Sequence, residues 1–234
     1  MATHFSNEVL KFLRALKRNN DRDWFAARKP IYERELKEPM LAIIREVNDA
    51  MLEFAPDNVR APQKTILRIY RDIRFSKDKR PYKIHQAAWW ARHGLEKTSG
   101  GGFYFDVSGT GVTLAAGVFM PQREQLLAIR RHLVEHHAEL RRLLAAKKLA
   151  KLMQPIDGQR LTRPPKGFSA DDPAIQRAMD LLLAKQWGVE TTLPADFATR
   201  PTLVKDIVEH FRLAAPIVAL LNAPLAPKPR RPLF

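Results

Sequence analysis

The sequence predicts an α+β fold in which an antiparallel sheet of about four strands is flanked by N-terminal and C-terminal helices. Apolar residues recur at spacings of three and four near both ends of the chain, whereas they alternate with other residues in the middle. The predicted strands also follow one another without helices between them, which favours antiparallel pairing.

The first 54 residues are predicted to be mostly helical. Ser6 can cap a first helix, because its side chain can accept a backbone hydrogen bond from the first turn. A second helix can begin near Asp21, and Pro30 should kink or end it. A third carries Pro39 in its first turn, where proline is tolerated.

Four segments in the middle of the chain have the character of strands. In the first of them the odd positions are apolar except Arg71, which predicts a half-buried strand. The last two are joined by a glycine-containing turn at 108–111. The four predicted strands are 67–75, 84–91, 103–107 and 112–119.

The C-terminal part returns to a helical pattern over 122–152. Asp172 followed by Pro173 is a typical cap and first turn for a helix that reaches about Leu183, and a further helix is expected over 202–213. We therefore expect a single α+β domain over residues 1–221, followed at 222–234 by a disordered, basic, proline-rich tail.

Composition excludes several classes of function. The chain has no cysteine, so disulfides, thiolate zinc sites, iron–sulfur clusters and cysteine nucleophiles are ruled out. The most apolar stretch, Leu213–Leu221, is too short to span a bilayer, so we expect no membrane partner. We expect a cytoplasmic location. Residues 132–136 match the H-x-x-E-H pattern of a zinc-protease helix, but they lie away from the apolar stripe of the predicted helix, on its solvated side. No phosphate-loop motif is present in the sequence. Neither a metal site nor a cofactor is predicted.

The basic residues are clustered along the sequence. The formal net charge is +15, and residues 64–83 carry eight basic and two acidic residues. Residues 122–152 carry eight basic and three acidic residues, which on an amphipathic helix is typical of a solvated face. A dense positive cluster on a strand and its loop repels itself unless carboxylates or a bound anion offset it.

We therefore predict an anion-binding surface built mainly on residues 68–83, with a nucleic-acid backbone or a phosphorylated molecule as the ligand. Asp72 is expected to orient the arginines beside it. Arg71 must find a buried carboxylate or lie at a bulge, because an unpaired buried charge is costly. The candidate residues are Arg68, Arg71, Asp72, Arg74, Lys77, Lys79, Tyr82, Lys83, Arg163 and Lys166.

Aromatic residues near the predicted basic strand are candidates for stacking on bases. Of the adjacent pair Trp89 and Trp90, alternation allows one to face the core, so the other is either exposed on the sheet or covered by a helix, and we favour the covered position. The remaining candidates are Trp24, Phe103, Tyr104, Phe105 and Trp187.

Two alternatives to anion binding remain at this point. The protein could be a hydrolase or transferase that acts on a small phosphorylated or carboxylated substrate, with Asp72 or Asp78 as the base. Alternatively, the basic strand could belong to an internal salt-bridge network with Glu33, Glu35 and Glu38. The sequence leaves open which applies, and it leaves the oligomeric state open as well.

Three parts of the sequence carry a family resemblance. Two are the motifs R-I-Y-R-D-I-R-F-S-K-D-K-R-P-Y-K at 68–83 and R-P-P-K-G-F at 163–168. The third is the N-terminal pattern Phe5…Leu10-Lys11-Phe12-Leu13…Asn19-Asn20…Trp24-Phe25…Lys29…Tyr32…Pro39. With these motifs the chain resembles a family of conserved bacterial and fungal proteins that is catalogued as a domain of unknown function. The resemblance extends to about Leu221 and implies a similar size and a single domain, but it supplies no catalytic residues.

Overall fold

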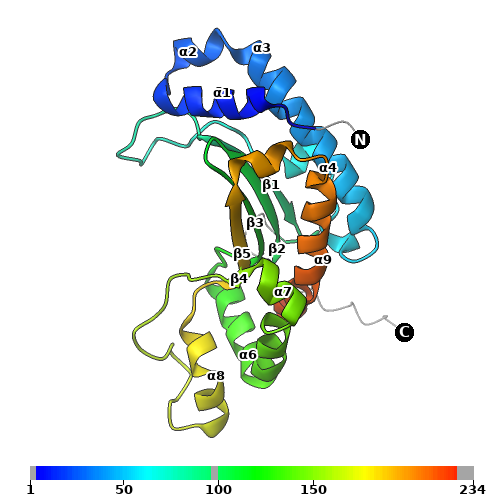
Figure 1. The fold of residues 1–234 in the computed structure, drawn as a ribbon. Helices are drawn as coiled ribbons and strands as arrows, with labels where there is room; N and C mark the ends of the chain where they lie inside the picture. Colours follow the sequence, from blue (N-terminus) through cyan, green and yellow to red (C-terminus); the bar gives the residue numbers. More distant parts are fainter. Residues whose placement is uncertain (1–3, 96–99, 226–234) are drawn as a thin grey trace, which may run out of the picture. The chain divides into compact units, whose positions relative to one another are not determined.

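The structure, a computed structural model, describes residues 4–95 and 100–225. Its strands form one antiparallel sheet with the order β1-β2-β3-β5-β4 (Figure 1). The strands are β1 (His85–Ala91), β2 (Gly102–Ser108), β3 (Gly111–Val118), β4 (Gln154–Pro155) and β5 (Trp187–Pro194). The predicted α+β class is confirmed, and three of the predicted strands correspond to β1, β2 and β3.

The described chain divides into two compact units. The first contains residues 4–90, 103–115 and 191–212, and the second contains 91–95, 100–102, 116–190 and 213–225. The basic segment 64–83 therefore belongs to the first unit, whereas the loop at 163–168 belongs to the second.

The N-terminal helices follow the local sequence signals. They are α1 (Asn7–Arg18), α2 (Arg22–Ala26), α3 (Lys29–Ile31), the π-helix η1 (Tyr32–Lys37) and α4 (Glu38–Met51). The Ser6 hydroxyl caps α1, and the Asp21 carboxylate caps α2. Because α2 ends at Ala26 and Pro30 lies in the first turn of α3, the predicted interruption is confirmed.

The core of the first unit lies on one face of β2. Phe103 contacts Phe211 of α9 (Leu203–Asn222) at 5.1 Å between ring centroids, and Trp90 contacts Phe211 at 5.3 Å. The fully buried residues of α4 are Met40, Ile43, Ile44, Val47 and Met51. Since side chains alternate along a strand, Tyr104 and Asp106 of β2 point to the opposite face from Phe103. The candidate site described below uses that opposite face.

The first predicted strand, 67–75, is not a strand of the sheet, and that prediction is wrong. Residues 66–84 form an irregular hairpin, which we call the basic hairpin, and its second arm leads into β1. Its pairing consists of isolated bridges between Ile66 and Ala88 and between Tyr70 and Tyr82. In Figure 1 it is the cyan-green loop beside α1.

Asp72 explains where the regular pairing stops. The last inter-arm backbone bond of the first arm joins the N–H of Arg71 to the carbonyl of Pro81 at 2.8 Å. At the next residue, the Asp72 carboxylate accepts from the backbone N–H of Arg74 at 3.2 Å. Such a contact two residues ahead forms a turn and competes with a strand ladder.

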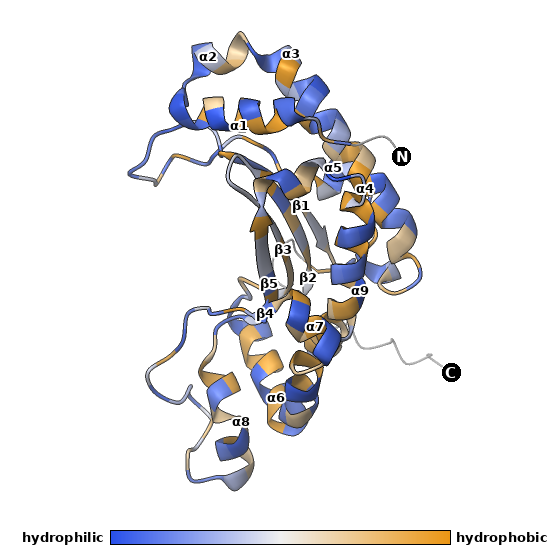
Figure 2. Cartoon of the chain, viewed as in Figure 1, coloured by the Kyte–Doolittle hydropathy of each residue, from blue (hydrophilic) through white to orange (hydrophobic). Residues whose placement is uncertain are grey.

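Helices dominate the second unit. The predicted helix over 122–152 is two helices, α6 (Arg123–Leu144) and α7 (Lys147–Leu152), with a break at 145–146. Hydrophobic and hydrophilic residues interleave along α6, as an amphipathic helix requires (Figure 2). Asp172 caps α8 (Pro173–Leu183) by accepting from the N–H of Ala174 at 2.8 Å, as predicted.

Strands β4 and β5 were not predicted. They pair antiparallel, with Gln154 opposite Glu190. Glycine weakens the strand signal of β5, and the structure shows why glycine is required there. A Cβ at Gly188 would collide with the backbone of Ala116 and Gly117, so the close approach of the two backbones needs a residue without a side chain.

Helix α9 is longer than the predicted 202–213. It continues through Pro216 because the residues beyond it, including Ile217 and Leu221, are fully buried. The predicted tail at 222–234 therefore begins with the last residue of α9 and the 3-10 helix η4 (Ala223–Leu225), and 226–234 lies outside the described residues. No helix within the described ranges has the length and apolar character needed to cross a bilayer.

Candidate functional site

The basic hairpin contains two copies of one local device, Asp-x-Arg. In the first, the guanidinium of Arg74 donates two hydrogen bonds to the Asp72 carboxylate, from Nε at 3.0 Å and from Nη2 at 2.8 Å. In the second, Arg80 grips Asp78 through Nε at 3.0 Å and Nη2 at 2.6 Å. In each copy the aspartate also accepts from the backbone N–H of its arginine. Each carboxylate therefore shapes a turn and binds the guanidinium of the arginine two residues ahead.

Arg71 is the third arginine held inside the hairpin. Its Nη1 donates to Asp78 Oδ2 at 2.6 Å and to the carbonyl of Arg80 at 3.2 Å. The expectation that Arg71 needs a carboxylate is confirmed, although Asp78 is half-buried rather than buried. The hydrogen bonds from Arg74 lower the pKa of Asp72 to about 2. Those from Arg80 and Arg71 hold the pKa of Asp78 well below its usual range.

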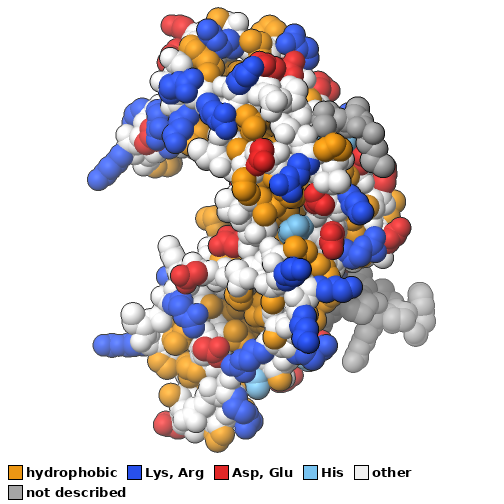
Figure 3. Space-filling model, viewed as in Figure 1, with side chains coloured by type: hydrophobic (Ala, Val, Ile, Leu, Met, Phe, Trp, Pro, Cys, Tyr) orange, Lys and Arg blue, Asp and Glu red, His pale blue; other side chains and the backbone are white. Residues whose placement is uncertain are grey.

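Other cations of the hairpin lack such partners. Among the described residues, the side chains of Arg68, Lys77 and Lys83 make no hydrogen bond or ion pair. Arg68 and Lys77 are exposed, and Lys83 is half-buried. Lys79 differs, since its Nζ donates to the carbonyl of Ile73 at 3.0 Å. The space-filling view shows Lys and Arg side chains gathered over this part of the first unit (Figure 3).

Tyr82 anchors the hairpin to the N-terminal helices. Its ring stacks on Phe25 with centroids 4.0 Å apart and an interplanar angle of 18°. Its backbone N–H and carbonyl are both bonded by the side-chain amide of Asn20, each at 3.0 Å. Tyr82 is buried, so its ring packs within the fold instead of offering a face to a ligand.

The aromatic residues predicted to stack on bases are mostly buried, and this prediction is wrong for them. The buried ones are Trp89, Trp90, Phe103, Phe105 and Trp187. The expectation that both tryptophans of the adjacent pair are covered is confirmed. Among residues 4–95 and 100–225, the exposed aromatic residues lie on the basic hairpin: Phe75 at its tip is 94% exposed and Tyr70 is 49% exposed.

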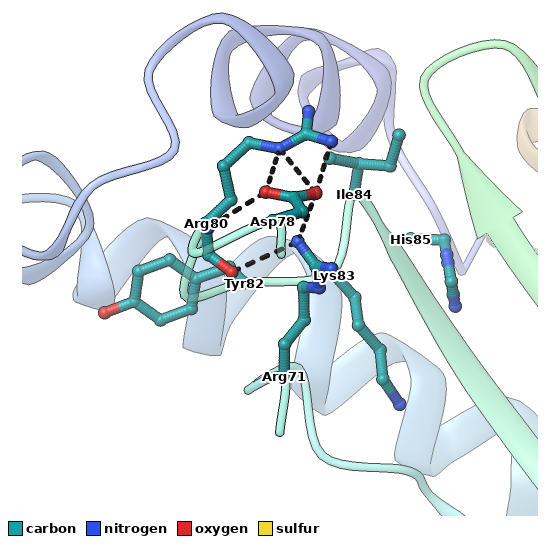
Figure 4. Close-up of a pocket in the computed structure, with 7 residues that line it drawn as sticks. All are labelled: Arg71, Asp78, Arg80, Tyr82, Lys83, Ile84 and His85. Carbon is teal, nitrogen blue, oxygen red and sulfur yellow. Dashed lines mark hydrogen bonds and ion pairs between the residues drawn. The ribbon is translucent and has the colours of Figure 1, made fainter. Parts of the chain in front are cut away.

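A partly open pocket of about 210 Å³ lies at the second arm of the hairpin (Figure 4). It is lined by Arg71, Asp78, Arg80, Tyr82, Lys83, Ile84 and His85. Figure 4 shows the guanidinium groups of Arg71 and Arg80 directed at Asp78, whereas the side chain of Lys83 extends away from that carboxylate. A second pocket, of about 400 Å³, lies near Lys79 and Arg80.

A buried polar cluster adjoins His85. Asp106 is 9% exposed, and the nearby side chains of Tyr104 and Thr113 favour its charged form. Burial raises the pKa of Asp106, and burial lowers the pKa of His85. Burial and the nearby charge of Arg68 also lower the pKa of Lys83. Perturbed groups of this kind gather at functional sites more often than elsewhere.

Arg163 and Lys166 are exposed residues of a loop in the second unit, between β4 and α8. They therefore belong to a different unit from the basic hairpin. The candidate site consists of residues of the first unit and does not include these two.

Sequence reasoning missed Arg80, His85, Asp106 and Phe75. For Arg80 a signal existed, since Asp78-Lys79-Arg80 repeats the spacing of Asp72-Ile73-Arg74. For Asp106 the signal was a carboxylate inside an otherwise apolar strand, which must be satisfied if it is buried. Asp106 and His85 lie on two different strands, so no local sequence pattern predicts that they come together.

Among protein families, the model described as conserved hypothetical protein (DUF2461) matches residues 8–219. Neither a curated protein nor a solved structure matches the chain.

Proposed function

The chain belongs to the DUF2461 family of conserved hypothetical proteins, and we propose that it is an anion-binding protein whose basic hairpin contacts the phosphate backbone of nucleic acid. The observation that carries this proposal is the set of unpartnered cations. Among the described residues, Arg68, Lys77 and Lys83 make no hydrogen bond or ion pair, although the charge of Arg68 adds to the effect of Arg74 on the pKa of Asp72. Phosphate groups would supply the missing negative charge.

The paired arginines support the same function. A guanidinium has five N–H donors, and Arg74 and Arg80 use their Nε and Nη2 atoms on aspartate. Their side chains are 77% and 55% exposed, so the remaining N–H groups can reach a phosphate. The aspartates thus set the direction of the guanidinium forks.

Phe75 favours a single strand as the ligand. A nearly fully exposed phenylalanine at the tip of a cationic hairpin offers a ring face on which a base can stack. The guanidinium of Arg74 lies 5.9 Å from the centroid of that ring, which places a phosphate-binding group beside the stacking surface. We place this activity in the cytoplasm, as expected from the sequence.

The two alternatives are less well supported. A general base must accept a proton near neutral pH, and the lowered pKa values of Asp72 and Asp78 make both poor bases. Two of the three glutamates expected to pair with the strand have other partners, since Glu33 pairs with Lys37 and Glu35 with Arg34. An internal network exists, but its acids are Asp72 and Asp78 of the hairpin itself.

Fluorescence anisotropy with a labelled single-stranded oligonucleotide tests the proposal. Three backbone contacts to a single strand predict that log K falls with log salt concentration with a slope of about −2. The triple variant Arg68→Gln, Lys77→Gln, Lys83→Gln should weaken binding about tenfold at low salt and flatten that slope.

The matched control removes the same charge from the second unit. Arg131, Lys147 and Lys148 are exposed and, within the described ranges, make no hydrogen bond or ion pair. The triple variant Arg131→Gln, Lys147→Gln, Lys148→Gln should keep nearly all of the affinity. Equal losses in both variants would mean that net charge alone attracts the oligonucleotide, and undetectable binding at low salt would disprove the proposal.

A further inference from the structure

We infer that the pocket lined by Arg71, Arg80, Lys83 and His85 receives a terminal phosphate monoester, on the end of a nucleic-acid strand or on a small molecule. The inference deepens the anion-binding function proposed above and rests on it. In this inference, the unpartnered Lys83 and the neighbouring His85 bind the same phosphate group. The other cations of the hairpin bind the internal phosphates of the backbone.

The size of the pocket limits the ligand group. Its volume of about 210 Å³ is below the roughly 300–1,000 Å³ typical of pockets for drug-sized ligands. A phosphate and the first atoms of its ester fit such a space, whereas a whole nucleotide must extend out of it. The partly open mouth allows this extension.

The charges of the lining residues call for an anion. Asp78 is the acidic residue among those lining the pocket, and two guanidinium groups already share it. Lys83 adds a positive charge that points away from Asp78, and the charge of Arg68 lies close enough to disfavour the charged form of Lys83. Two neighbouring like charges, one of them half-buried, are stabilised by a ligand with more than one negative charge.

Donor number distinguishes a terminal phosphate from an internal one. A monoester carries about −1.5 to −2 charges near pH 7 and has three terminal oxygens, whereas a diester carries one charge and two such oxygens. Guanidinium N–H groups, the Lys83 ammonium and a ring N–H of His85 supply enough donors for all three oxygens.

The polar cluster next to His85 keeps that ring in a polar setting. The charge of Asp106 opposes the effect of burial, which lowers the pKa of His85. A neutral ring whose N–H faces a carboxylate offers only a lone pair at its other nitrogen, so donation to phosphate requires the protonated ring, in which both nitrogens carry a proton. A ligand with about two negative charges itself favours that form, and His85 then donates an N–H to it.

The test measures by fluorescence anisotropy how tightly the full chain binds three single-stranded oligonucleotides. The first has a 5′-hydroxyl, the second is the same strand with a 5′-phosphate, and the third is a 5′-hydroxyl strand longer by one nucleotide. The longer strand controls for an added backbone charge. We expect the 5′-phosphate to raise affinity about tenfold and the extra nucleotide to raise it less than twofold. Lys83→Gln and His85→Gln should each abolish the preference.

Lys77→Gln is the matched variant, because Lys77 belongs to the hairpin and does not line the pocket. It should weaken all three strands and keep their ratio. Lys83→Met, which retains the apolar stem of the half-buried lysine, replaces Lys83→Gln if the latter does not fold. Circular dichroism verifies folding.

The outcomes separate this inference from the proposed function. If all strands bind with equal affinity, the pocket inference is wrong and backbone binding stands. If no strand binds, but inorganic phosphate or a nucleoside 5′-monophosphate binds the wild-type chain and not Lys83→Met, the pocket stands with a small-molecule ligand and nucleic-acid binding is wrong. If none of these probes binds, both proposals are wrong.

Discussion

The basic hairpin and helix α6 with α7 carry similar charge in the sequence, yet the structure uses the two sets of cations differently. Around α6, Arg141 donates to Asp180 at 2.6 Å and to the carbonyl of Arg177 at 2.8 Å, both on α8. The buried Arg130 donates to the carbonyl of Ala184 at 3.0 Å. These arginines connect two helices of the second unit, so they stabilise structure.

In the hairpin, by contrast, the acids are supplied locally and there are too few of them. Two aspartates hold three arginines, and Arg68, Lys77 and Lys83 are left without partners among the described residues. Net charge along a segment therefore does not indicate binding, and neither does the number of unpartnered cations, since the three α6 and α7 residues of the control variant also make no hydrogen bond or ion pair among the described residues. What distinguishes the hairpin is that its unpartnered cations lie on one short segment together with two exposed guanidinium groups oriented by aspartate and an exposed aromatic ring at the tip.

The largest effect on stability is expected at Arg130. Arg130→Ala removes a buried side chain and leaves the carbonyl of Ala184 without its donor, which should lower the free energy of unfolding by about 2 kcal/mol. Oligonucleotide affinity should not change. Chemical denaturation measures the loss, and Arg130→Met, which keeps most of the apolar stem, should lose less. A binding defect in a folded Arg130 variant would break the distinction between the two regions.

Phe75→Ala should have the next largest effect, and on binding alone. Stacking of a base on an aromatic ring contributes roughly 1–3 kcal/mol, so affinity for a single strand should fall about tenfold. Because Phe75 is almost fully exposed, the thermal midpoint should stay the same. Met120→Ala removes another exposed apolar side chain, 68% exposed and in the second unit, and should leave affinity intact. Unchanged affinity in Phe75→Ala would exclude stacking at the tip.

Strong acid should loosen the first turn of the hairpin. The pKa of Asp72 is lowered from 3.8 to about 2, so its pairing with Arg74 stabilises the folded hairpin above pH 4 and is lost as the pH falls toward 2. The Nε–H resonance of Arg74 should report this loss in an NMR titration. Asp72→Asn should shift the Arg74 signal at neutral pH and leave that of Arg80 in place, since Arg80 is held by Asp78. Simultaneous loss of both signals in Asp72→Asn would mean that the two turns are not independent.

The smallest effect is expected at Arg142. Its Nη2 lies 4.0 Å from Glu139 on the exposed side of α6, and surface pairs of this kind contribute little. Arg142→Ala should change the free energy of unfolding by less than about 0.5 kcal/mol and should not change binding. A larger loss would show that the solvated face of α6 carries an interaction that its geometry does not reveal.

Much of the site could not be predicted because it depends on burial. Alternation placed Arg68, Asp72 and Arg74 on one face of a strand, but the Asp72 carboxylate turns back on its own backbone and ends the strand. Arg71 was expected to need a carboxylate, and the partner proved to be Asp78, seven residues along the chain. The role of Asp106 emerges only when strands β1, β2 and β3 bring His85, Tyr104 and Thr113 to it.

The sequence by itself determined the features that depend on neighbouring residues: the caps at Ser6, Asp21 and Asp172, the helix end before Pro30, and the strands that became β1, β2 and β3. Their hydrogen bonds and periodicities span a few residues, so local spacing is sufficient to identify them. The tertiary structure decided the glycine-dependent pairing of β5, the continuation of α9 through Pro216, and which cations of the hairpin remain without partners. These depend on contacts between residues distant along the chain, whose energies local spacing does not contain.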